Sequence, residues 1–142
     1  ECAAIGFKVA SEEDLDKAAH YYKAKGQPAA FVERPYQGRT LRVVDPFGLP
    51  LELCFKMEQR EILLQKFAYY RGVQPQRLDH FNVFAPDVQG SLDFYAGLGF
   101  RLTEYAEEDG PNGRIAAGWM QSPQDTNLGS ELLLTVGRRI RF

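Results

Sequence analysis

The chain repeats one pattern at a constant spacing of 73 residues. The matching pairs are Asp14 and Asp87, Leu15 and Val88, Tyr22 and Tyr95, and Gly26 and Gly99. Because one spacing aligns the start of a helix, an inward tyrosine and the end of a helix in both halves, we infer an internal duplication. Each half should therefore be one structural unit, and the fold class follows from the order of elements in that unit.

Hydrophobic periodicity in the first half predicts a strand, a helix and three further strands. Residues 3–10 form a short apolar run, which is typical of a buried strand. Residues 11–26 begin with a serine that can cap a helix, carry apolar residues at helical spacing, and end at a glycine. The later strands are predicted at residues 29–34, 40–45 and 49–55, with Asp45-Pro46-Phe47-Gly48 as the turn between the last two.

The second half repeats this order. Its predicted elements are a strand at residues 78–85, a helix at 87–99, and strands at 100–108, 114–121 and 131–136. We therefore predict an α+β fold of two tandem βαβββ modules, at residues 1–56 and 77–142. A linking helix and a polar loop are expected at residues 57–76. Two such modules side by side form a curved sheet around a trough, which is a typical place for a ligand.

Composition excludes several classes of partner. The net charge of -2 leaves no basic excess for nucleic-acid phosphates. No apolar run reaches the roughly 18 residues that a membrane span needs, and no signal peptide is visible. Two cysteines, Cys2 and Cys54, are too few for a disulfide framework, so we expect reduced thiols in a cytoplasmic protein.

The residue most suggestive of chemistry is His80, at the start of an apolar strand. Alternate residues of a strand share a face, so His80 and Asn82 should point the same way. An imidazole nitrogen is a suitable ligand for Fe(II) or Mn(II). From the residues alone, the alternative is a core or edge histidine that is hydrogen-bonded to the backbone.

The HFN sequence at residues 80–82, the two helix-ending glycines and the DPFG turn resemble the vicinal oxygen chelate superfamily, which includes glyoxalases, bleomycin resistance proteins and dioxygenases. Within it, the chain is most similar to extradiol ring-cleaving dioxygenases of the homoprotocatechuate (3,4-dihydroxyphenylacetate) 2,3-dioxygenase type. The specific part is RLDHFNVFAPDVQGSLDFYAGLGFRLTEY, and the similarity covers residues 1 to about 121. In that family, four βαβββ modules form two domains. The chain resembles the second and third modules, so we expect a fragment, with a tail from about residue 122 that departs as a truncated or frame-shifted gene would.

The resemblance implies an oxidoreductase that inserts O2 into catecholic aromatic acids such as 3,4-dihydroxyphenylacetate. It implies a non-heme Fe(II) centre, with Mn(II) as the other option, held by two histidines and one glutamate. His80 matches the first histidine ligand, Asn82 matches an asparagine near the substrate, and Trp119 matches an aromatic residue of the catechol pocket. A strand-edge role for Asn82 and core packing for Trp119 remain open. A homo-oligomer is also expected, because incomplete modules of this superfamily often pair across chains.

Other parts of the family's site have no match here. Asn127 stands where the family has its acid–base histidine, and no second histidine-led strand follows, so no catalytic residue is assigned and the metal site is expected to be incomplete. Glu52 lies where an active module carries its carboxylate ligand, but the 73-residue spacing pairs His80 with Phe7. We therefore expect Glu52 to be a salt-bridged or solvated glutamate. His20 is expected to lie on the surface of its helix.

Two other functions fit the same fold. The first is a non-catalytic module that binds a small aromatic molecule, which would need no metal. The second is a glyoxalase-type lyase or isomerase with a metal shared between chains, which would need a histidine in the first half.

Overall fold

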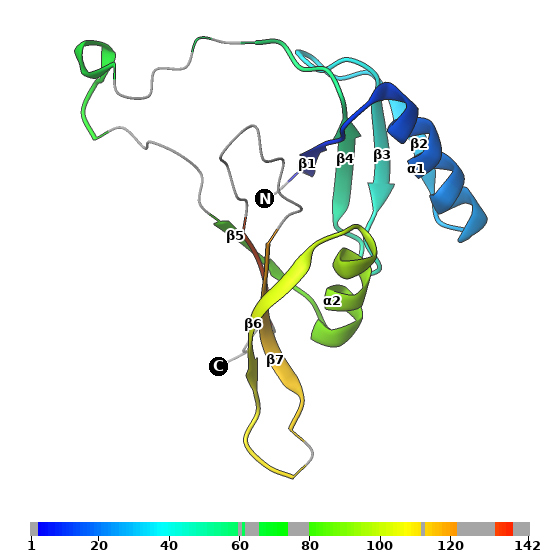
Figure 1. Cartoon of the computed structure of the whole chain (residues 1–142), viewed down its shortest axis with the longest axis vertical. Coiled ribbons are helices and arrows are strands. Elements are labelled where there is room, and N and C mark those ends of the chain that lie inside the picture. Colours follow the sequence, from blue (N-terminus) through cyan, green and yellow to red (C-terminus); the bar gives the residue numbers. More distant parts are fainter. Residues whose placement is uncertain are drawn as a thin grey trace. The chain divides into compact units, whose positions relative to one another are not determined.

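The computed structural model describes residues 3–59, 61, 66–73, 80–111, 113–121 and 133–137. The chain divides into two compact units, Glu1–Ile62 and Leu63–Phe142, drawn in Figure 1. The boundary between them falls within the segment predicted to link the modules. At residues 80, 81 and 133–137, the structure describes the backbone alone.

Both units have the same topology. The first consists of β1 (Ile5–Lys8), α1 (Glu12–Ala24), β2 (Ala29–Val32), β3 (Thr40–Val44) and β4 (Pro50–Cys54), with sheet order β1-β4-β3-β2. The second consists of β5 (His80–Phe84), α2 (Val88–Gly97), β6 (Arg101–Glu107), β7 (Ile115–Gln121) and β8 (Leu133–Gly137), with sheet order β5-β8-β7-β6. In each sheet, the first strand is parallel to the last, and the other pairs are antiparallel. The predicted α+β fold of two βαβββ modules is confirmed.

The two helices end in the same way, which explains the 73-residue repeat. Gly26 and Gly99 both have positive φ angles, 68° and 94°, a conformation that glycine adopts without steric cost. The residue after each glycine donates its N–H back into the last helical turn. These bonds run from Gln27 N to Tyr22 O (2.9 Å) and from Phe100 N to Tyr95 O (3.1 Å). The repeated Tyr-x-x-x-Gly sequence therefore encodes a shared helix-ending motif.

The two helices begin differently, because α1 is longer than α2. The helices have 13 and 10 residues, and their N-caps, Ser11 and Asp87, are 76 residues apart rather than 73. The last residues of the preceding strands, Lys8 and Phe84, are also 76 residues apart. One additional helical turn therefore separates the alignment of the strands from the alignment of the helix ends.

This additional turn corrects one prediction. With a spacing of 76, the first-unit counterpart of His80 is Ala4, so the pairing with Phe7 was wrong. Phe7 pairs with Leu53, on the face of the sheet that packs under α1, whereas Gly6 pairs with Glu52 on the opposite face. The conclusion drawn from that pairing is unchanged, because Ala4 cannot bind a metal through its side chain.

Each helix covers one face of its own sheet. In the first unit, the buried residues between helix and sheet are Leu15, Tyr22, Leu41, Val43 and Leu51. In the second unit, α2 lies so close to β7 that a Cβ atom at Gly118 would be 2.8 Å from Leu92 Cδ2. Gly118 therefore allows the close approach of α2, and the face of the sheet shared by Val83 and Met120 is the buried one.

The predicted linking helix is wrong over the residues described. Met57 forms an isolated β-bridge with Gln37, and the one helical stretch described between the units is a 3-10 turn, Phe67–Tyr69. Phe67 and Tyr69 are 73% and 64% exposed, so the apolar residues of this turn have no packed face to stabilise a longer helix. Within the described part of the chain, no helix is long and apolar enough to cross a membrane.

The hydroxyl of Tyr22 makes α1 less stable than it could be. It is buried, no hydrogen-bond partner exists for it among the described residues, and burial raises the pKa of Tyr22 to about 12. We expect Tyr22→Phe to raise the free energy of unfolding by about 1 kcal/mol, because a buried polar group without a partner is costly. Urea denaturation measures the change. Tyr21→Phe, at a half-exposed neighbouring position, should have no effect, and a clear loss of stability in Tyr22→Phe would contradict the prediction.

Candidate functional site

Strand pairing brings the predicted site positions onto one face of the second sheet. Asn82 of β5 pairs with Thr135 of β8, and Thr135 pairs with Trp119 of β7. Paired residues of neighbouring strands lie on the same face, so Asn82 and Trp119 share the face opposite α2. The alternation of β5 assigns position 80 to this face as well. The side chain of His80 lies outside the described part of the structure.

The two described side chains are accessible on this face. Asn82 is exposed and Trp119 is half-buried, whereas the adjacent Val83 and Met120 are buried under α2. Trp119 is therefore not enclosed by the helix-side core, and the indole is available to a ligand. An indole face and an amide on one open sheet surface can contact a flat aromatic ring and its polar substituents.

A polar pair that sequence reasoning missed lies in the row of position 80. His80 pairs with Leu133, which pairs with Gln121 of β7. Gln121 is buried, and Arg101 Nη2 of the edge strand β6 donates a hydrogen bond to Gln121 Oε1 at 2.7 Å. The alternation of β7 from Trp119 to Gln121 was visible in the sequence. The partner Arg101 was not, because it depends on the register between β6 and β7.

Glu52 is bound by two arginines, as the sequence predicted. Glu52 is buried, and its Oε1 atom accepts hydrogen bonds from Arg34 Nε at 2.7 Å and from Arg42 Nη1 at 3.0 Å. The salt-bridged interpretation is confirmed. A metal ion at this carboxylate would have to displace two charge-assisted hydrogen bonds.

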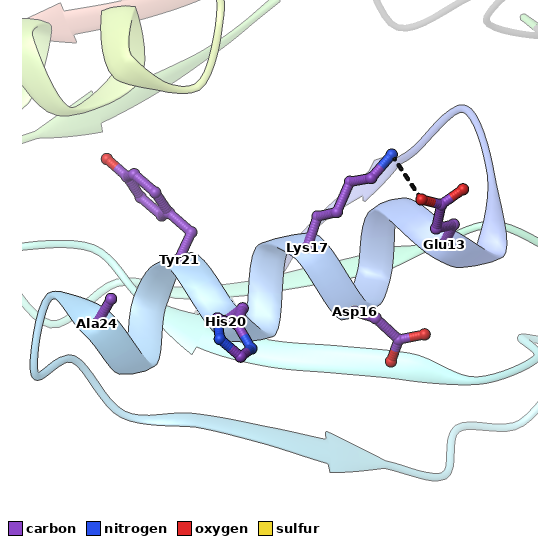
Figure 2. Close-up of a pocket in the computed structure, with 6 residues that line it drawn as sticks. All are labelled: Glu13, Asp16, Lys17, His20, Tyr21 and Ala24. Atoms are coloured by element: carbon purple, nitrogen blue, oxygen red, sulfur yellow. Dashed lines mark ion pairs between the residues drawn. The ribbon is translucent and has the colours of Figure 1, made fainter.

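His20 lies on the exposed face of α1, which confirms the prediction of a surface residue. An open hollow along this face is lined by Glu13, Asp16, Lys17, His20, Tyr21 and Ala24, as Figure 2 shows. The charged groups beside His20 are already paired, Lys17 Nζ with Glu13 Oε1 at 3.1 Å and Asp16 Oδ1 with Arg39 Nη2 at 2.7 Å. The hollow is therefore a solvated helix face rather than a cluster of free ligands.

The donor set of the described residues does not form a complete iron site. Non-heme Fe(II) oxygenases use two histidines and a carboxylate on one face. The sequence has two histidines, His20 on α1 and His80 on β5. The described residues include no group of three or more His, Cys, Asp or Glu side chains that could hold a metal ion.

The remaining predicted positions fall into two groups. Cys54 is a free, buried thiol whose pKa is raised mainly by burial, as expected of a reduced structural cysteine. Cys2 and Asn127 lie outside the described residues.

Comparison with solved structures gives strong similarities. A variant of homoprotocatechuate 2,3-dioxygenase from Brevibacterium fuscum has 34% sequence identity and a TM-score of 0.77, with 94% of this chain and 36% of that chain covered. Homoprotocatechuate 2,3-dioxygenase from Arthrobacter globiformis has 31% identity and a TM-score of 0.77, with 95% and 41% covered. A second Brevibacterium fuscum variant, solved in complex with HPCA, has 34% identity and a TM-score of 0.77 over 94% and 36%. The chain thus spans a little over a third of the length of these proteins.

Sequence comparisons give one further result. Residues 77–133, which contain β5, α2, β6 and β7, match the family model described as Glyoxalase/Bleomycin resistance protein/Dioxygenase superfamily. No curated protein sequence gives a significant match. The family match, the repeated βαβββ topology and the structural similarity agree, and the chain belongs to the glyoxalase/bleomycin resistance protein/dioxygenase superfamily.

Proposed function

We propose that this chain forms part of an extradiol dioxygenase that cleaves a catecholic aromatic acid such as 3,4-dihydroxyphenylacetate with O2. In this proposal, His80 is one ligand of a non-heme Fe(II) or Mn(II) ion, and Asn82 and Trp119 contact the catechol. The observation that carries the proposal is the shared face of positions 80, 82 and 119, in a chain 31–34% identical to homoprotocatechuate 2,3-dioxygenases.

The chemistry of this face supports a flat, polar-edged ligand. A catechol ring can stack on the half-buried indole of Trp119, and its oxygens can hydrogen-bond to the exposed amide of Asn82. A divalent metal would supply a Lewis acid beside the ring oxygens. The remaining ligands would have to come from residues other than those described, because His80 is the one histidine of its unit.

The first test uses the 142-residue chain and a graft. The chain mixed with 3,4-dihydroxyphenylacetate, Fe(II) and air is expected to give no ring-opened product, because His20 and His80 lie in different units. Residues 3–121 grafted in place of the matching segment of homoprotocatechuate 2,3-dioxygenase are expected to support ring cleavage. The absorbance of the ring-opened product measures both. Robust turnover by the chain alone, or a folded graft without activity, would contradict the proposal.

A non-catalytic binding module is the second candidate, and the accessibility of Trp119 is the observation in its favour. It predicts that aromatic ligands quench Trp119 fluorescence equally with and without a metal, in a chain whose graft has no activity. A glyoxalase-type enzyme is less well supported, because Ala4 stands where the first unit would need its histidine.

A further inference from the structure

The face of the first sheet opposite α1 gathers positive charge around one buried carboxylate. Arg42 pairs with Glu52 across β3 and β4, and Lys8 pairs with Cys54 one row away. Arg34 lies two residues beyond the end of β2 and reaches the same carboxylate. Three cationic side chains thus surround one anionic side chain, which leaves a local excess of two positive charges.

The two arginines are fixed by Glu52 but remain partly open to solvent. Both donate to the same oxygen, Glu52 Oε1, whose side chain is 10% exposed, while the arginine side chains are 34% and 36% exposed. Arg34 also donates from Nη1 to the carbonyl of Glu33 at 3.3 Å. Within the described residues, Arg34 Nη2 and Arg42 Nε and Nη2 have no hydrogen-bond partner. The two forks therefore keep donors that a further acceptor could use.

Lys8 adds a third positive charge at the same place. Its side chain is exposed, and Glu52 and Lys8 act in opposite directions on the pKa of Cys54, which places both charges near this buried thiol. Because Lys8 has no ion pair among the described residues, its charge is not neutralised by the protein. An anion on this face would meet two guanidinium groups and one ammonium group.

We propose that this face of the first unit binds a small oxyanion, a carboxylate or a phosphate group, through Arg34 and Arg42, with Lys8 as an additional charge. Guanidinium forks match the geometry of carboxylate and phosphate oxygens. Glu52 holds the two forks close together, so less side-chain freedom is lost when the anion binds. The site lies in the first unit and does not depend on the dioxygenase function proposed for the second.

The test is isothermal titration calorimetry of the 142-residue chain at low ionic strength, with inorganic phosphate in one series and acetate in the other. Arg42→Gln is expected to weaken binding by about tenfold or more, the effect of losing a charge-assisted hydrogen bond. Lys8→Gln should weaken it about threefold, as expected of a solvent-exposed charge. The matched control is Arg39→Gln, because Arg39 pairs with Asp16 and covers Phe31 on the α1 side of the sheet.

The outcomes separate the possibilities. Saturable binding of phosphate alone, acetate alone or both, weakened by Arg42→Gln and Lys8→Gln but not by Arg39→Gln, supports the site and identifies the preferred anion. No saturable binding of either anion, or equal weakening by all three variants, overturns it. Lys8→Gln keeps the test decisive if Arg42→Gln unfolds, because Lys8 is exposed and does not contact Glu52 through an ion pair.

Discussion

In the active graft of residues 3–121, His80→Ala is expected to lower kcat/KM for 3,4-dihydroxyphenylacetate by more than about 100-fold. Loss of a group that only supports a metal ligand costs about 10–100-fold in metal affinity or activity, so loss of a ligand should cost more. Position 80 shares its face with Asn82 and Trp119, away from the buried core, so the effect should fall on metal binding rather than on folding. Metal content per chain, measured beside the rate of ring opening, checks this reason.

The matched control is the other histidine. His20→Ala removes an exposed imidazole from α1 and should leave activity, metal content and stability unchanged. Asn82→Ala and Trp119→Ala should raise KM while metal content stays normal, because these residues are proposed to contact the catechol. An active, metal-loaded His80→Ala graft would exclude His80 as a ligand.

Tyr95→Ala is expected to lower the free energy of unfolding of the second unit by about 3–5 kcal/mol. Tyr95 is fully buried, and its ring lies edge-on to Phe94 and Phe100 at centroid distances of 5.2 and 5.8 Å. Removing a buried aromatic side chain loses its burial and leaves a cavity, for which costs of this size are typical. The hydrogen bond from Phe100 N to Tyr95 O connects the same residue to the helix-ending turn.

Urea denaturation followed by circular dichroism measures this loss, and Tyr105→Ala provides the control. Tyr105 lies on the exposed strand β6 and is 57% exposed, so its truncation should cost less than about 1 kcal/mol. Similar losses in Tyr95→Ala and Tyr105→Ala would show that Tyr95 does not stabilise the core beneath α2.

The sequence predicted those parts of the fold that depend on local signals. Helix α1 was predicted from a capping serine, helical spacing and a final glycine, and the structure has Ser11 as N-cap and Gly26 at positive φ. The segment at 57–76 has a helix-like composition but no packed apolar face over its described residues, so composition alone was misleading.

Predictions that depended on three-dimensional pairing were less accurate. The correspondence of His80 with Phe7 failed because one additional turn of α1 changes the spacing between strands, and a single offset cannot reveal an insertion. The pairing of Arg101 with Gln121 depends on strand register, which includes irregularities between β6 and β7. The arginines of Glu52 could be expected only in kind, since Arg34 and Glu52 are 18 residues apart.

The position of β8 makes the proposed histidine strand dependent on a distant segment. β8 lies between β5 and β7, so β5 is joined to the rest of its sheet through β8 alone among the described strands. The segment from Leu133 to Gly137 therefore acts as the anchor of His80, although it follows the stretch in which resemblance to the dioxygenases ends. Proteolytic cleavage or a stop codon before residue 133 would release β5 from its sheet even though every proposed ligand-contacting residue remained in the chain.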